Sequence, residues 1–198
     1  MIESLLLAVT RVSTMSGDNV LTGATGFFFE RDGRLFLVTS RHVAIDEASN
    51  HRPDRLTIEL HVDRQNIANV IQWSIPLYDG NQALWRQGVD SGGTVDVVAV
   101  EIHRQALPQT VLFSPFTPNH LVAELDQVEV GTAVLIVGFP LGFHDNLHHL
   151  PVARHAGIAS AFGIRFQGQG YFLTDARMHR GTSGAPVVAR VTDRKSVV

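Results

Sequence analysis

The sequence predicts an all-β fold of the sandwich or barrel class. Short runs of branched and aromatic residues recur along the chain, and turn signals separate them about every 8–12 residues. The 3.6-residue periodicity of amphipathic helices is weak throughout. Hydrophobic residues make up 44% of the 198-residue chain and charged residues 18%. This composition excludes general disorder and suffices for a sizeable buried core.

Six strands are expected in the first half of the chain. They cover residues 5–12, 26–30, 34–39, 55–62, 69–77 and 94–102. Asp32-Gly33 lies between the second and the third, and Asp-Gly is the strongest short hairpin signal. In the fourth strand Leu56, Ile58 and Leu60 alternate with polar residues, as in a half-buried strand. Residues 43–49 are compatible with one short helix.

A proline-rich loop divides the chain in two. Pro108, Pro115 and Pro118 mark it. We therefore expect an N-terminal unit of residues 1–112 and a C-terminal unit of residues 113–198. The elements expected beyond the loop are a short helix at 119–124 and strands at 127–130, 133–139, 152–161, 162–167, 171–175 and 186–191.

Composition and charge exclude several classes of function. The chain has no cysteine, hence no disulfide, no thiolate nucleophile and no cysteine-ligated metal. A net charge of −3 gives no indication of binding to nucleic acid or to an anionic membrane. No apolar run reaches the length of about 18 residues that a transmembrane helix needs, and the apolar start lacks the basic region of a secretory signal. A cytoplasmic location is therefore expected. Lys195 is the only lysine, which suggests a tail of different origin or a truncation near Val198.

Three polar residues stand where expected strands meet loops: His42, Asp96 and Ser183. A serine hydroxyl attacks a carbonyl only when a base removes its proton, and histidine titrates near neutral pH. Asp96 stands among valines, so we expect it to be buried and to need a partner, which His42 supplies. Asp79 and Asp90 on nearby loops are competing candidates. The residue types predict Ser183 as nucleophile, His42 as base and Asp96 as the acid that orients the base.

Gly181 supplies a second feature of such a site. Its backbone freedom lets the amides of Gly181 and Ser183 converge on one point, as an oxyanion hole requires. The chain order His, Asp, Ser excludes the α/β-hydrolases, whose order is Ser, Asp, His, because residues 184–198 contain no histidine. The subtilisin order begins with Asp and belongs to an α/β fold. The order found here is that of the chymotrypsin-like double β-barrel.

Five sequence blocks, in one order along the chain, carry a family resemblance. They are Gly-Ala-Thr-Gly-Phe-Phe at 23–28, Val-Thr-Ser-Arg-His-Val at 38–43, Asp-Val-Val-Ala-Val at 96–100, Gly-Thr-Ala-Val-Leu-Ile-Val-Gly-Phe-Pro at 131–140 and Gly-Thr-Ser-Gly-Ala-Pro at 181–186. With these blocks the chain resembles the trypsin-like serine peptidases of the chymotrypsin fold. Within that family it resembles the bacterial, cysteine-free branch that includes the HtrA-type proteases.

The resemblance implies two antiparallel β-barrels of six strands each, the first with His42 and Asp96 and the second with Ser183. The family continues for some tens of residues after the nucleophile, so the second barrel is expected to be incomplete at the C-terminus. The implied activity is that of a serine endopeptidase, which cleaves peptides or proteins through an acyl-enzyme intermediate and needs no cofactor. Thr182 stands where animal trypsins carry Asp, so activation by a new N-terminal amine is not expected. Arg177 stands at the floor of the primary specificity pocket and would favour an acidic side chain before the scissile bond.

Alternative interpretations remain for two features. With the last strands missing, the chain could be a catalytically silent binding module, or a protease that a partner or a second copy of the chain completes. A group of histidines raises the question of a metal site. Its members are His144, His148, His149 and His155, beside Asp145. Because no compact two-ligand motif on a helix is present, we predict a polar surface loop and no metal.

Overall fold

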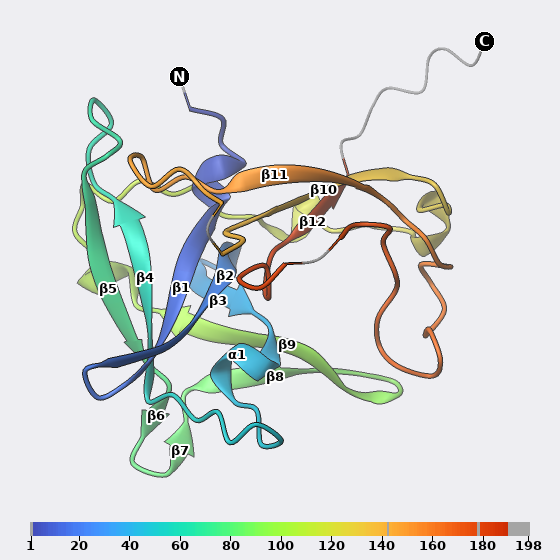
Figure 1. Ribbon diagram of the computed structural model, residues 1–198, viewed down its shortest axis with the longest axis horizontal. Coiled ribbons are helices and arrows are strands. Elements are labelled where there is room, and N and C mark those ends of the chain that lie inside the picture. Colours follow the sequence, from blue (N-terminus) through green and yellow to red (C-terminus); the bar gives the residue numbers. More distant parts are fainter. Residues whose placement is uncertain (1, 142, 178, 190–198) are drawn as a thin grey trace.

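The computed structural model describes residues 2–141, 143–177 and 179–189 (Figure 1). Its strands form a seven-stranded antiparallel sheet of order β5-β4-β1-β2-β3-β9-β8, a three-stranded sheet of order β11-β10-β12, and the small hairpin β6-β7. This architecture confirms the all-β fold class. The expected tail around Lys195 lies outside the described residues, as do the last two residues of the strand expected at 186–191. Within the described ranges, no helix is long and apolar enough to cross a membrane.

The elements follow one another along the chain with only one α-helix among the residues described. The larger sheet and the small hairpin comprise β1 Val9–Ser16, β2 Asn19–Arg31, β3 Arg34–Thr39, β4 Arg55–His61, β5 Val70–Pro76, β6 Tyr78–Asp79, β7 Gln82–Ala83, β8 Trp85–Asp90 and β9 Gly93–Ile102. The helix α1 spans Arg41–Ala44, directly after β3. The smaller sheet comprises β10 Ala133–Gly138, β11 Val152–Gly157 and β12 Val187–Ala189.

The hairpin expected at Asp32-Gly33 is confirmed. β2 and β3 pair up to Arg31 opposite Arg34, which leaves a two-residue turn. Asp32 and Gly33 have φ angles of 52° and 74°. Both positive values are those of a type I′ turn, whose twist matches that of the flanking strands.

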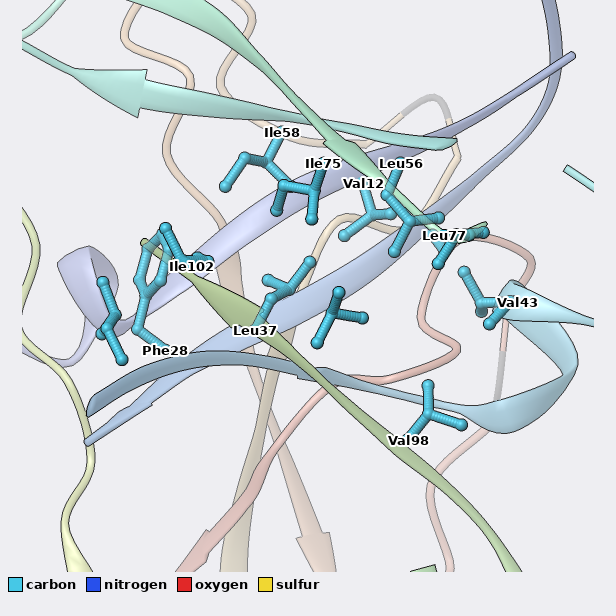
Figure 2. Close-up of a cluster of buried hydrophobic side chains, with 14 of the residues drawn as sticks. Val12, Phe28, Leu37, Val43, Leu56, Ile58, Ile75, Leu77, Val98 and Ile102 are labelled. Atoms are coloured by element: carbon cyan, nitrogen blue, oxygen red, sulfur yellow. The ribbon is translucent and has the colours of Figure 1, made fainter. Parts of the chain in front are cut away.

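The main hydrophobic core is formed mainly by side chains from the strands of the larger sheet (Figure 2). The predicted alternation in β4 is confirmed, because Leu56, Ile58 and Leu60 are almost fully buried. They belong to one buried cluster with residues from other strands, such as Val12 of the neighbouring β1 and Leu37 of β3. A second, smaller cluster packs Val9 and its neighbours against β10, and so holds the smaller sheet to the start of β1; its buried members are Ala8, Val9, Leu135, Val137 and Phe139.

Several predicted elements are wrong, and all of them are short. Residues 6–8 form a 3-10 helix before β1. The strand expected at 127–130 is absent, because a 3-10 helix at Leu125–Gln127 includes its first residue and residues 128–130 form no strand. The strands expected at 162–167 and 171–175 are absent among the described residues, where isolated bridges occur instead. Turns break this stretch, since Gln167 and Gly168 both have positive φ. β8 was not predicted, because its sequence is mostly polar and contains Gly88.

The strand count of the larger sheet is seven, where a six-stranded barrel was expected. The smaller sheet shows three strands in the described part of the second half. The expected incompleteness of the second barrel stays a prediction, because residues 190–198 lie outside the described part. The proposed division at residues 112 and 113 also stays a prediction.

Candidate active site

Three side chains from distant parts of the chain form one hydrogen-bonded series. His42 lies in α1, Asp96 in β9, and Ser183 in the loop before β12. Nδ1 of His42 lies 2.7 Å from Oδ2 of Asp96, and Nε2 of His42 lies 2.8 Å from Oγ of Ser183. A carboxylate only accepts hydrogen bonds, so Nδ1 carries the proton and Nε2 of the neutral ring is free to accept the Ser183 hydroxyl. The three residues singled out in the sequence thus meet in the geometry that nucleophilic activation requires.

Asp96 owes its position to a bulge in β9. Gln87 of β8 pairs with Val98, whereas Val89 pairs with Thr94. Three residues of β9 therefore face Gly88 alone, and Asp96 is the middle one. Extra residues of this kind redirect a side chain out of the regular ladder.

The side chain of Gln87 forms hydrogen bonds across the bulge. Its Nε2 donates to the carbonyl oxygen of Val95 at 2.7 Å, and its Oε1 accepts from Nε of Arg41 at 2.8 Å. Arg41 directly precedes His42, and Val95 directly precedes Asp96. The Gln87 amide therefore links the backbone of Val95, beside Asp96, to the side chain of Arg41, beside His42.

Asp96 is not buried, contrary to the sequence-based expectation. Its side chain is 55% exposed, and that of His42 is 49% exposed. The bulge turns the carboxylate outward, while Val98 and Val100 of the same strand face the core. The backbone amide of His42 donates to Oδ1 of Asp96 at 2.9 Å, so both carboxylate oxygens contact the same residue.

The hydrogen bonds shift both titrations toward the charged pair. The hydrogen bond to Asp96 raises the pKa of His42 above its ordinary value, against a smaller opposing effect of burial. Burial is the largest single influence on Asp96 and would raise the pKa of its carboxyl. The bonds from the ring and the backbone of His42 together outweigh it, so the pKa of Asp96 lies below its ordinary value.

The two competing carboxylates lie elsewhere. Asp90, at the end of β8, forms an ion pair with Arg165. Asp79 belongs to β6 and pairs with Gln82 across the small hairpin. Neither accepts a hydrogen bond from His42 in the described part of the chain.

The loop that carries Ser183 requires glycine on either side. Gly181 and Gly184 have φ angles of 91° and 84°, in the left-handed region. A Cβ on Gly181 would lie 2.4 Å from the carbonyl oxygen of Phe139, and one on Gly184 would lie 2.1 Å from that of Thr25. These positions therefore exclude any larger residue on steric grounds as well as on backbone grounds.

The two candidate oxyanion amides have no protein acceptor within the described ranges. None of the hydrogen bonds found there uses the amide of Gly181 or of Ser183. The amide of Leu141 donates to the carbonyl oxygen of Arg180 at 2.8 Å. The carbonyl of Arg180 and the amide of Gly181 belong to one trans peptide and point in opposite directions, so the Gly181 amide points away from Leu141.

Thr182 closes the turn before the serine. It is 4% exposed, and its hydroxyl donates to the carbonyl oxygen of His179 at 2.6 Å. The amide of Ala185 donates to the carbonyl oxygen of Thr182 at 2.9 Å. The uncharged residue at position 182 is therefore satisfied within its own loop.

A cleft of about 630 Å³ opens beside His42 and Ser183. Its walls come from β2, α1, the segment after α1 and the serine loop, and its lining residues are Leu21, Thr22, Gly23, Ala24, His42, Val43, Asp46, Ser49, Asn50, His51, Leu141, Arg180, Gly181 and Ser183. Arg177 is exposed and does not line it. The role of Arg177 in a specificity pocket stays a prediction.

The histidines considered as metal ligands do not form one cluster. His148 bonds Asp145, with 2.7 Å between Nδ1 and Oδ2, whereas Nδ1 of His149 lies 3.1 Å from Oε2 of Glu59. The ring of His144 packs edge-on against Phe139. Across the residues that the structure describes, no group of three or more such side chains could hold a metal ion. The expectation of a metal-free protein remains a prediction.

Sequence reasoning missed the residues that hold these side chains in place. No sequence pattern predicts the roles of Gln87 and Arg41, because these roles depend on a bulge that the sequence does not indicate. Thr25, inside the first of the five blocks, is fully buried beside the serine loop. Its place within that block was the one hint that the sequence offered.

Comparisons with known proteins bear on the family and the fold of the chain. A model of the trypsin-like peptidase domain family matches residues 24–194. No curated protein matches the chain. Among solved structures, the crystal structure of the serine endoprotease from Yersinia pestis is similar, with a TM-score of 0.55 and 17% sequence identity. The match covers 93% of this chain and 50% of that one, so the chain spans half the length of that protein. The likeness confirms the chymotrypsin-like fold class.

Proposed function

Because the chain belongs to the trypsin-like peptidase family, we propose that it is a serine endopeptidase with Ser183, His42 and Asp96 as its catalytic residues. The observation that carries the proposal is the hydrogen-bonded series from Asp96 through His42 to Ser183. The family implies a peptide or protein substrate, and the adjoining cleft is open to one.

Acylation begins at the hydroxyl of Ser183. Its oxygen bonds to the carbonyl carbon of the substrate while its proton passes to Nε2 of His42. The carbonyl electron pair moves onto the substrate oxygen, which accepts hydrogen bonds from the amides of Gly181 and Ser183. Asp96 stabilises the imidazolium. The proton then passes from Nε2 to the leaving nitrogen, the C–N bond breaks, and an acyl-enzyme and a free amine remain.

Deacylation repeats these steps with water. His42 takes a proton from the water as its oxygen bonds to the acyl carbon, and the same two amides hold the oxyanion. The bond to Ser183 then breaks, and Nε2 returns the proton to the serine oxygen. The products are a carboxylic acid and the original enzyme, so no cofactor is consumed.

The nucleophile is tested with a fluorophosphonate probe and with casein as substrate. We expect the probe to label the wild type at Ser183 and the protein to cleave denatured casein. Ser183→Ala should abolish labelling and lower turnover by about 10⁶-fold. Ser74→Ala, at an exposed serine of the edge strand β5, is the matched control and should behave as the wild type. A wild type that neither reacts nor cleaves would contradict the proposal.

The same experiment separates the alternatives left by the sequence. A catalytically silent binding module would retain a peptide without labelling in any fraction. A protease that a second copy completes would label only in the larger fraction of a size-exclusion run. Activity that is independent of protein concentration and confined to the monomer would support a competent single chain.

The proposed pocket role of Arg177 predicts a preference for acidic residues. An exposed guanidinium attracts Asp or Glu before the scissile bond and repels Lys or Arg. Arg177→Glu should therefore reverse the ratio of kcat/KM between matched glutamyl and lysyl peptides. Arg64→Glu, at an exposed position after β4, should leave the ratio unchanged. An unaltered ratio in Arg177→Glu would place the determinant elsewhere.

A further inference from the structure

One buried hydroxyl joins three segments of the candidate site. Thr25 lies in β2 and is fully buried. Its Oγ1 donates to the carbonyl oxygen of Gly181 at 2.7 Å and accepts from the amide of Phe139 at 2.9 Å. Phe139 directly follows β10, and Gly181 lies two residues before Ser183. The single hydroxyl proton is committed to Gly181, so the orientation of the hydroxyl is fixed.

The backbone of Thr25 holds the other side of the serine. Its amide donates to the carbonyl oxygen of Ser183 at 2.9 Å. Its carbonyl oxygen accepts from the hydroxyl of Thr39 at 2.7 Å. The carbonyl groups of Gly181 and Ser183 are therefore both anchored on Thr25. Between them lies the peptide that carries the Ser183 amide.

The Gly181 amide depends on the same hydroxyl through a second route. The Arg180–Gly181 peptide is oriented by the amide of Leu141, which donates to the carbonyl of Arg180. Leu141 is two residues beyond Phe139, and the intervening Pro140 has a fixed φ angle. By binding the amide of Phe139, the Thr25 hydroxyl places the segment that orients the Gly181 peptide.

We propose that Thr25 is a positioning residue whose hydroxyl aims the amides of Gly181 and Ser183 at the developing oxyanion. The inference rests on the proposed peptidase function and adds to it a determinant of turnover that touches no substrate. Thr25 acts on the transition state, because the oxyanion forms only there. It leaves ground-state binding in the cleft unchanged, since Thr25 is not among the residues that line the cleft.

Valine has the shape of threonine without the hydroxyl, so Thr25→Val isolates this effect. A methyl group requires about 3.5 Å to a neighbouring heavy atom, more than the 2.7 and 2.9 Å that the hydroxyl bonds span. The Gly181 carbonyl and the Phe139 amide must then move apart. Displacements of this size at a reacting centre cost about 10- to 100-fold in rate.

The chain offers a matched control in Thr10 of β1. Thr10 is also buried, and its hydroxyl also bridges two backbone groups: it donates to the carbonyl of Glu59 at 2.8 Å and accepts from the Glu59 amide at 3.3 Å. These bonds join β1 to β4 and make no contact with the serine loop. Thr10→Val therefore removes an equivalent hydroxyl without the positioning effect.

The test measures kcat, KM and the thermal midpoint of Thr25→Val, Thr25→Ser and Thr10→Val. We expect Thr25→Val to lose about 10- to 100-fold in kcat with KM within about threefold of the wild type. Affinity for a peptide boronic acid, whose tetrahedral oxygen occupies the oxyanion position, should fall in parallel. Thr25→Ser keeps the hydroxyl, so its kcat should be close to that of the wild type. Thr10→Val should lower the thermal midpoint and leave kcat unchanged.

Two results would overturn the inference while the proposed function stands. One is a wild-type kcat in Thr25→Val, and the other is an equal loss of kcat in Thr10→Val. If Thr25→Val does not fold, Thr25→Cys serves in its place, because a thiol is a much weaker donor: a retained kcat then overturns the inference, and a reduced kcat with unchanged KM supports it. A wild type without labelling or cleavage would overturn the proposed function and the inference together.

Discussion

Two glycines set the local geometry of the serine loop, and Gly184 is the more constrained. Its Cα faces the carbonyl oxygen of Thr25 and the hydroxyl of Thr39, both within about 2.2 Å of where a Cβ would stand. Its φ of 84° adds a backbone penalty for any other residue. The approach of β2 and β3 to the loop is therefore possible only with a hydrogen atom at this position.

Gly184→Ala should be severely destabilising. We expect a loss of at least about 3 kcal/mol in the free energy of unfolding, since strain and steric overlap add. Gly168→Ala is the control, because Gly168 also has positive φ but has no atom within 4 Å of the position that a methyl group would take. It should cost only about 1–2 kcal/mol. Equal losses in urea unfolding would show that the close approach to Thr25 and Thr39 is not decisive.

In the proposed mechanism, Asp96 sets the pH at which His42 becomes an active base. The base must be neutral, so kcat/KM falls as the pH drops through the pKa of His42, which the bond to Asp96 raises above 6.5. In Asp96→Asn the amide no longer stabilises the imidazolium. The acidic limb of the pH profile should therefore move to lower pH, while the plateau falls by about 10⁴-fold because the ring tautomer is no longer fixed.

The comparison for this variant is Asp79→Asn, which alters a carboxylate of the small β6-β7 hairpin. Both its plateau and its acidic limb should match those of the wild type. A limb that stays in place in Asp96→Asn would show that Asp96 does not control the titration of His42.

At the residue scale, sequence reasoning identified the types of the site residues but not their surroundings. His42, Asp96 and Ser183 could be named because nucleophilic catalysis needs those groups and the blocks around them occur in order. The expected burial of Asp96 was wrong, since alternation along a strand does not reveal a bulge. Thr25 could not be assigned its role, because its partner Gly181 is 156 residues away.

Among the elements, the β8-β9 pair positions Asp96. Its bulge aims Asp96 outward, and Gln87 spans the bulge to reach Arg41 beside His42. A strand that contributes no side chain to the proposed triad is thus hydrogen-bonded to the residues that precede His42 and Asp96.

Gln87→Met should weaken this link while keeping the size of the side chain. Without it, Val95 and Arg41 are no longer joined, and we expect a loss of about tenfold in kcat together with a shift of the acidic limb to lower pH. Gln72→Met, on the edge strand β5, removes an exposed amide that bonds Glu59 and should change neither quantity. Wild-type kcat and pH profile in Gln87→Met would contradict a positioning role for Gln87.

Strands and turns were predicted correctly where the local sequence pattern was distinctive. The β2-β3 hairpin was predicted because Asp32-Gly33 fits a turn with two positive φ angles. The segment 162–175 was expected to contain strands at 162–167 and 171–175, yet its aromatic rings pair with one another, as Phe162 does with Phe172. Aromatic contact within a loop and strand pairing produce similar compositions, so the sequence could not separate them.

At the scale of the whole molecule, the site exists only where the two sheets meet. The larger sheet and the helix that follows β3 supply Asp96 and His42, and the loop before the last strand of the smaller sheet supplies Ser183. Their contact is held by the small cluster around Val9 and Phe139 and by Thr25. Farther away, Arg165 forms an ion pair with Asp90 at the tip of the β8-β9 hairpin. Sequence order alone could not reveal these long-range contacts.

The Arg165–Asp90 pair should contribute little to global stability. Both side chains are partly exposed, and exposed ion pairs are weakened by solvent and salt. Arg165→Ala should shift the thermal midpoint by only a few degrees, and salt at about 1 M should abolish the difference. Hydrogen exchange at the amide of Gly92, which bonds Asp90, should accelerate. A large shift that persists in salt would show that this contact holds the two sheets together.

The hydroxyl of Thr182, bonded within its own loop, has a consequence for activation. The resemblance places the Asp of the animal trypsins at this position, where its carboxylate pairs with a newly formed N-terminal amine. The hydroxyl of Thr182 carries no charge and donates instead to the carbonyl oxygen of His179. On the proposed function, the charge balance at position 182 is therefore complete without any group from outside the loop. A newly formed N-terminal amine would find no carboxylate there to bind.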